Sequence, residues 1–303
     1  MPEKLYLNCG VDCEPLQEKS PMCGGPESWE VSEQTILRFV QLFTENDLLA
    51  GLSFHPTPEA AAAHPDLLSD LKGRGIEIGI QPNVPGFRFP TYDLDLGCYD
   101  RDAQRKILGE ALEDFQDALG FLPEVYTACC GSKSRDTYPL LMELGFRVSR
   151  APVAGRYLSD RPDRCTMGMF PYPHWASDHH VIAGCRPLYV VPMTGDITAI
   201  GRDRRPPDLR PEREPNDETR AGYRHIVDMN LEVMRLIDAP VKAIVIGTHN
   251  TGRVHFDNLQ YVLDYVREKA ASEGMELAPI SALGLRAVAE AMGAPGGYGD
   301  DPR

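Results

Sequence analysis

The distribution of apolar residues along the chain predicts strands that alternate with helices. Several short, β-branched runs contain few polar residues, which is typical of strands buried on both faces of a parallel sheet. The predicted strands cover residues 5–9, 50–54, 76–81, 124–129, 146–149, 188–193, 243–247 and 276–280.

Apolar residues recur at helical spacing between these strands. The predicted helical stripes cover residues 36–43, 107–119, 223–237, 259–266 and 285–292, and Asp100 or Asp102 is a suitable N-cap for the second of them. Alternation of strands and helices indicates βα units and a parallel sheet. We therefore expect an α/β fold in a single domain: a closed or nearly closed barrel of seven or eight parallel strands.

Two stretches interrupt this alternation. Residues 81–99 are rich in proline, glycine and aromatic side chains, and residues 151–215 contain a run of proline and arginine. Long loops inside a compact domain are usually functional or disordered, and in a barrel the loops after the strands build the active-site face. We expect the domain to span residues 1–295, with 151–215 as a long loop that covers or borders the cleft. Residues 296–303 are expected to form a flexible tail.

Composition and charge narrow the function classes. The chain has 303 residues, of which 42% are hydrophobic, and 31 basic residues against 45 acidic ones give a net charge of −14. Such an acidic chain is a poor partner for nucleic acid or for an anionic membrane surface. No apolar run approaches the ~20 residues that span a bilayer. We expect an enzyme, and its oligomeric state is left open.

The chain has 8 cysteines but no Cys-x-x-Cys pair. A chain of this length does not need disulfides for stability, and a zinc ribbon or thioredoxin-like motif is unsupported. The N-terminal residues contain no long apolar segment typical of a secretory signal. These features favour reduced thiols and a cytoplasmic location.

Polar residues follow the predicted strands at the positions where a barrel would build its site. Asp12 and Glu14 follow the first strand in a turn with glycine and proline. Paired carboxylates suit a metal or general-base chemistry, although acidic residues in turns also serve as caps or lie in solvent. His55 and His249 each follow an apolar strand. Each is a candidate acid, base or metal ligand, or a hydrogen-bonded core histidine.

The order of these segments resembles the polysaccharide deacetylase superfamily, the NodB-homology group of metal-dependent de-N-acetylases. LYLNCGVDCEP resembles the opening aspartate motif of that family, and HPDLLSDLKGRGIEIGIQPN resembles its second motif. DFQDALGFLPEVYTACCGSKSRDTYPLLMELGFRVS resembles the region of the third motif. VIGTHNTG resembles the final histidine motif, and MELAPISAL the closing strand and helix. The resemblance spans residues 5–292 and implies a distorted (β/α) barrel.

The resemblance also implies an activity on a small-molecule or oligosaccharide substrate: hydrolysis of a C–N amide bond, foremost de-N-acetylation of a sugar. It assigns Asp12 as the catalytic base, Glu14 as the metal-ligand carboxylate and His249 as the acid that protonates the leaving amine. The chain departs from the family at Gln81, where the first of two histidine ligands is expected, and no histidine follows in QPNVPGFRFP. The arginine of the third motif is also absent from TACCGS.

The resemblance implies one divalent metal, zinc or another cation, for which the ligands at hand are Glu14, Gln81 and His55. Amide oxygens bind hard cations but are poor zinc ligands, so we expect weak occupancy. His174 lies in the cluster PHWASDHH. It is a further substitute ligand, although a polar lid surface is the alternative interpretation.

The loops offer residues for substrate binding, because aromatic and arginine side chains suit sugar stacking. The expected set is Asn83, Arg88, Tyr92, His174 and Trp175. A second function remains open: a catalytically silent, carbohydrate-binding relative that kept the barrel and lost the metal site. A fold alone does not separate the two, because function belongs to the site.

Overall fold

The computed structural model describes residues 3–19, 24–84, 91–178 and 182–293. Every strand predicted from the sequence is present within a few residues of its expected place. The strands are β1 (Lys4–Cys13), β2 (Leu52–Pro56), β3 (Glu77–Ile78), β4 (Val125–Thr127), β5 (Val148–Ala151), β7 (Arg186–Pro192), β8 (Ala243–His249) and β9 (Glu276–Pro279). The expected flexible tail and Arg88 lie outside the described residues.

The predicted helical stripes form the longer helices of the structure. They are α1 (Trp29–Glu45), α4 (Arg101–Leu119), α6 (Asp217–Leu236), α7 (Phe256–Ser272) and α8 (Ala282–Ala291). Asp100 is the N-cap of α4 and accepts a hydrogen bond from Ala103 N, as expected. The apolar periodicity did not indicate α2 (Pro58–Ala63), α3 (Pro65–Gly73) or α5 (Thr137–Glu143), although the family resemblance includes helices at α3 and α5. These helices are too short for a 3.6-residue period to stand out.

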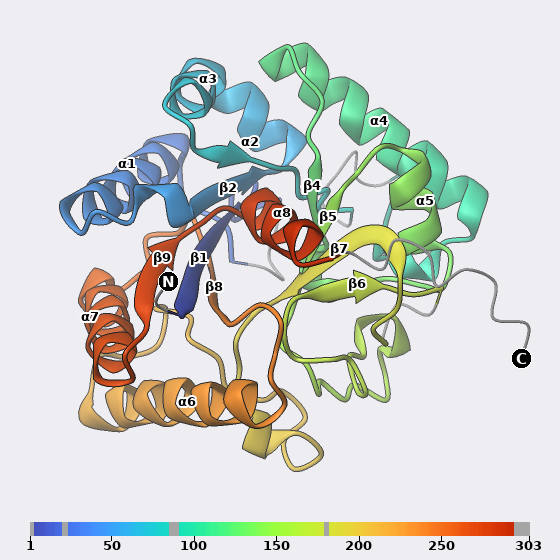
Figure 1. The fold of residues 1–303 in the computed structure, drawn as a ribbon. Helices are drawn as coiled ribbons and strands as arrows, with labels where there is room; N and C mark the ends of the chain where they lie inside the picture. The colour runs from blue at the N-terminus through green and yellow to red at the C-terminus, as the bar shows by residue number, and fades with distance from the viewer. Residues whose placement is uncertain (1–2, 20–23, 85–90, 179–181, 294–303) are drawn as a thin grey trace, which may run out of the picture.

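The strands form two sheets (Figure 1). The 5-stranded sheet has the order β3-β2-β1-β8, with β9 also paired to β1, and all its pairs are parallel. The 4-stranded sheet has the order β4-β5-β7-β6, in which only β6 (His174–Ala176) is antiparallel. Ile80 N donates to Val125 O at 2.9 Å, and Thr194 N donates to Val245 O at 2.9 Å. The described chain is therefore an α/β fold with mostly parallel strands, whose two sheets are joined by hydrogen bonds.

The segment 151–215 is not one long loop, contrary to expectation. It contains β7, which the apolar pattern predicts, and β6, which it does not. In β6 the sequence HWA has no apolar run, and its pairing of His174 with Val190 of β7 is a tertiary contact. The local sequence does not specify this long-range strand pairing.

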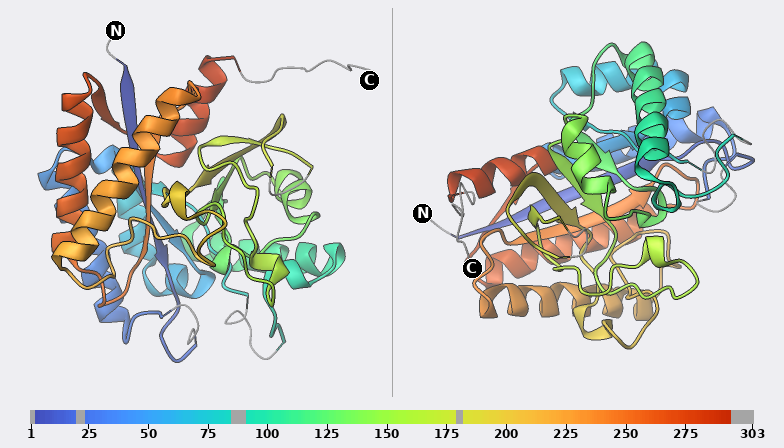
Figure 2. Two further views of the ribbon diagram at one scale, coloured as in Figure 1. Left: turned by 90° about the horizontal axis from the view of Figure 1, so that it is seen from below. Right: turned by 90° about the vertical axis from the view of Figure 1, so that its right-hand side faces the viewer.

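Helix α8 lies at the end of the molecule where the parallel strands begin. It occupies the centre of Figure 1, and in the left view of Figure 2 it lies at the upper end, near the start of β1. Glu77 of β3 caps this helix by accepting hydrogen bonds from Ala282 N at 3.1 Å and Leu283 N at 2.8 Å. Leu285 of α8 belongs to a buried apolar cluster that also contains Val245 and Tyr189, one from each sheet. The opposite end, where β1 and β8 finish, is therefore the one left for a site.

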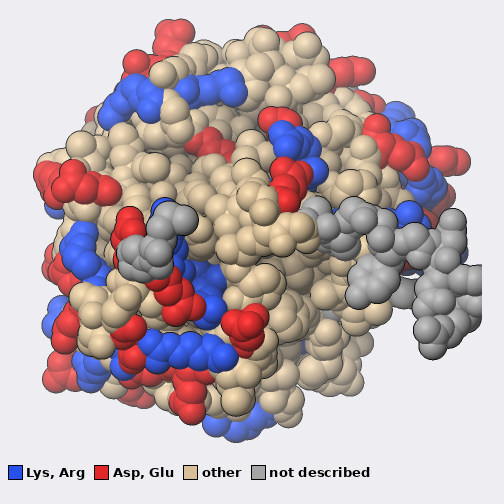
Figure 3. Space-filling model, in the orientation of Figure 1, with Lys and Arg blue, Asp and Glu red and all other residues tan. Residues whose placement is uncertain are grey.

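Acidic and basic side chains are interspersed over the face that carries α8 (Figure 3). In the described part of the chain, no helix combines the length and the apolar character needed to cross a membrane.

Candidate active site

Asp12 lies near the C-terminal end of β1, between two histidines from neighbouring strands. In the parallel register Asp12 is paired with His55 of β2 on one side and with His249 of β8 on the other. Paired residues of adjacent strands point to the same face of a sheet. The structure thus brings together the predicted base, the predicted acid and one predicted metal ligand. The side chain of Asp12 is 22% exposed, so water reaches it.

His55 is a fully buried side chain. Its Nδ1 is 3.3 Å from Asp12 Oδ1, although the pair is not aligned for a hydrogen bond. Burial lowers the pKa of His55, against the opposing effect of Asp12. His55 is therefore a neutral neighbour of Asp12 near pH 7.

His249 forms an ion pair with Glu212, a residue that the sequence analysis did not single out. Nδ1 of His249 is 2.8 Å from Glu212 Oε1, and the Thr248 hydroxyl donates to the same oxygen at 3.0 Å. Burial alone would lower the pKa of His249, but the hydrogen bond and charge of Glu212 raise it to about 9. His249 is thus an imidazolium at neutral pH, which is the state that a general acid requires.

Glu14 is a fully buried carboxyl group held by two amides. Gln81 Nε2 donates to Oε1 at 3.0 Å, and Asn83 Nδ2 donates to Oε2 at 2.8 Å. The backbone N–H of Glu14 donates to Asn250 Oδ1 at 2.8 Å. Burial raises the pKa of Glu14 to about 7, against the opposing charge of His249. The structure therefore places Gln81, an expected metal ligand, and Asn83, expected to bind substrate, as hydrogen-bond donors to Glu14.

This arrangement does not fit a divalent metal. Both oxygens of Glu14 accept N–H groups, so Gln81 and Asn83 present donors rather than oxygens to the carboxylate. A cation needs lone pairs directed at it, and amide N–H groups repel it. Across residues 3–19, 24–84, 91–178 and 182–293, no three His, Cys, Asp or Glu side chains group in a way that could hold a metal.

Three residues expected to bind substrate have contacts elsewhere. Tyr92 donates to Glu110 Oε2 of α4 at 2.9 Å. His174 is buried with its Nδ1 2.7 Å from Tyr172 O, and burial lowers its pKa to about 4. Trp175 packs against Tyr189 and beneath Arg286 of α8. Trp175 therefore lies toward the α8 end of the strands. Among the described residues that were expected to bind substrate, only Asn83 contacts Glu14.

A buried arginine, also not singled out from the sequence, lies against β1 at Gly10, two residues before Asp12. Arg150 of β5 donates to Asn8 Oδ1 and, at 3.1 Å, to Ile246 O. Its guanidinium covers Gly10, where an added Cβ would be 2.2 Å from Arg150 Cζ. A charged residue in an apolar strand was the available signal, because arginine is almost never fully buried without a partner. Glu212, inside a proline-arginine run, gave no comparable signal.

Comparisons with known proteins identify the fold. No family model matches the chain, and no curated protein matches it. A solved structure named as a polysaccharide deacetylase from Mycobacterium smegmatis is similar, with a TM-score of 0.56, 16% identity, and coverage of 95% of this chain and 92% of that one. One from Pseudomonas aeruginosa PAO1 has a TM-score of 0.58, 14% identity, and coverage of 96% and 92%. PuuE allantoinase has a TM-score of 0.58, 16% identity, and coverage of 96% and 91%. The resemblance to polysaccharide deacetylases is thus confirmed at the level of the fold.

Proposed function

We propose that this protein hydrolyses a C–N amide bond, foremost by de-N-acetylation of a sugar, with Asp12 as general base and His249 as general acid. The observation that carries the proposal is the register position of Asp12 beside His249, together with the Glu212 pair that keeps His249 protonated. The names of the structural neighbours support the reaction class, since two are polysaccharide deacetylases and one is an allantoinase.

The proposed reaction has two proton transfers. Asp12 accepts a proton from water while the water oxygen attacks the acyl carbon. The tetrahedral intermediate then breaks its C–N bond, and the His249 imidazolium gives a proton to the departing nitrogen. Glu212 holds His249 in position and stabilises its charge before this transfer. The products are a carboxylic acid and an amine, and one water molecule is consumed.

Glu14 has no direct part in this scheme because it is fully buried. Its role is to order Gln81 and Asn83 at the ends of the strands. No step passes through a metal, since the residues around Glu14 do not fit one.

We also propose that the two sheets form a single barrel. The two sheets meet at both edges, through Ile80 with Val125 and through Thr194 with Val245. These contacts support one distorted (β/α) barrel in which the mouth, at the C-terminal ends of the strands, carries Asp12 and His249.

The second candidate is a catalytically silent, carbohydrate-binding relative. It is favoured by the hydrogen bonds that Gln81 and Asn83 donate to Glu14, because they replace the expected metal ligands. Under this alternative, sugar binding persists without turnover.

Release of amine from N-acetylglucosamine and N,N′-diacetylchitobiose, and opening of the allantoin ring to a carboxylate, both in buffer containing EDTA, test the proposal. We expect Asp12→Asn to lower turnover by about 10²–10⁴-fold, the usual contribution of general-base catalysis, with an unchanged melting temperature. His249→Ala should also lower turnover, most for poor leaving groups. The matched control is His225→Ala, on the exposed face of α6. Sugar binding that survives Asp12→Asn, with no hydrolysis by the wild-type protein, would establish the silent relative instead.

A further inference from the structure

Arginine side chains gather at one border of the candidate active site, although the chain has a net charge of −14. Tyr157 N donates to Arg204 O at 2.9 Å, and this hydrogen bond joins the loop after β5 to the loop after β7. Arg156 and Arg205 are the neighbours of these two residues in sequence. The loops therefore place two guanidinium groups in one region.

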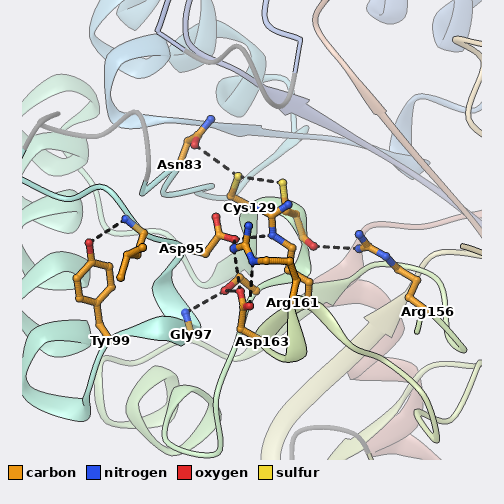
Figure 4. Close-up of polar contacts among 12 residues, drawn as sticks. Asn83, Asp95, Gly97, Tyr99, Cys129, Arg156, Arg161 and Asp163 are labelled. Carbon is orange, nitrogen blue, oxygen red and sulfur yellow. Dashed lines mark hydrogen bonds and ion pairs between the residues drawn. The ribbon is translucent and has the colours of Figure 1, made fainter. Parts of the chain in front are cut away.

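Arg156 is connected to the candidate active site by a series of contacts (Figure 4). Its Nη1 donates to Cys130 O at 2.9 Å. The neighbouring thiol of Cys129 is 3.4 Å from Asn83 Oδ1, and Asn83 donates to Glu14. Arg156 thus borders the same group of side chains that surrounds the predicted site.

Other arginines of this region are balanced by carboxylates. Arg161 and Arg164 both contact Asp95. Figure 4 shows Arg161 beside Asp95. Arg210 is held by Asp208 through Nη2 at 2.7 Å, and Arg204 pairs with Asp160 at 2.6 Å.

Arg156 and Arg205 differ from these arginines. Within the described residues, neither has an acidic partner, and Arg156 donates to a neutral carbonyl. Burial and the nearby charges of Arg205 and Arg210 together lower the pKa of Arg156 to about 10. Repulsion between neighbouring like charges raises the free energy of the folded protein. An anion that binds between them offsets this repulsion.

We propose that Arg156 and Arg205 form a subsite for an oxyanion, a carboxylate or a phosphate, carried by the molecule that enters this site. Guanidinium groups suit this role because their planar N–H pairs match carboxylate and phosphate oxygens. Resting on the proposed function, the substrate is an N-acyl compound with an anionic group rather than a neutral sugar.

Binding of inorganic phosphate and of acetate, measured by titration calorimetry, tests the subsite without any turnover. We expect saturable binding of one of them, and about 10-fold weaker binding in Arg156→Gln and in Arg205→Gln, the loss typical of one charge-assisted contact. Phosphate and acetate distinguish the two oxyanion classes. Arg74→Gln, on the exposed C-terminal end of α3, is the matched control and should bind as the wild type does. No saturable binding, or equal binding by all variants, would overturn the subsite.

Arg205 is exposed, so Arg205→Gln retains the fold even if Arg156→Gln does not. A second experiment compares the hydrolysis of N-acetylglucosamine 6-phosphate with that of N-acetylglucosamine. We expect the phosphorylated compound to have the lower KM, and Arg205→Gln to remove that difference while kcat is retained. Anion binding without hydrolysis would refute the proposed function and leave the subsite. Hydrolysis of the neutral sugar without anion binding would refute the subsite and leave the function.

Discussion

Glu212 Oε1 and His249 Nδ1 lie 2.8 Å apart, and the two residues come from different segments of the chain. Glu212 belongs to the loop before α6, whereas His249 ends β8. The carboxylate of Glu212 therefore controls the protonation of a side chain that the fold alone places beside Asp12.

The first prediction concerns this pair. The pKa of His249 is raised from 6.5 to about 9, so the pair stabilises the fold fully below pH 6.5 and loses this effect as the pH rises through about 9. Activity that requires protonated His249 should fall over the same alkaline range. We expect Glu212→Gln to move this fall in kcat/KM toward neutral pH. An unchanged alkaline limb in the variant would show that His249 is not the acid.

The second prediction concerns Glu14. Its pKa is raised from 4.5 to about 7, so the stabilisation due to its protonated form is complete below pH 4.5 and is lost as the pH rises through 7. Glu14→Gln cannot titrate. Relative to this variant, the wild type should lose up to about 3 kcal/mol of unfolding free energy across that range. Urea denaturation at several pH values measures the difference, and parallel curves for both proteins would contradict the expectation.

The third prediction tests the packing of Arg150 on Gly10. A methyl group at residue 10 would meet the guanidinium at 2.2 Å. Because this arginine is buried and cannot move freely, Gly10→Ala should cost about 1–3 kcal/mol of unfolding free energy. Gly109→Ala is the matched control, since that glycine lies inside α4 with no atom within 4 Å of its added Cβ. The control should be neutral or stabilising by about 0.5–1 kcal/mol. Equal stability of the two variants would refute the close contact.

The fourth prediction concerns metal. Because Gln81 and Asn83 direct N–H groups at Glu14, zinc or magnesium should not raise the melting temperature, and EDTA should not lower it. A ligand that binds only the folded state shifts the melting temperature with its concentration. A saturable rise with stoichiometric zinc would show that the amides reorient to bind it.

The sequence predicted much of the site because strand ends are readable. Asp12, His55 and His249 each follow an apolar run, and parallel pairing brings such positions to one edge. The partner of His249 was not predictable, since Glu212 lies in a segment without periodicity and reaches the site by tertiary packing. For the same reason the sequence predicts His174 and Trp175 as substrate-binding loop residues, whereas they belong to a strand whose pairing depends on β7. The approximate places of individual elements follow from the sequence, and contacts between distant loops do not.

The placement of β1 has a consequence for biosynthesis. On one edge, residues 9–13 pair with β2 at residues 52–56, but the other edge pairs with β8, which begins at Ala243. At about 5–20 residues per second, a ribosome needs roughly 10–50 s to make the intervening chain. Throughout that interval the apolar first strand has an open edge, so the nascent chain is exposed to aggregation until β8 emerges.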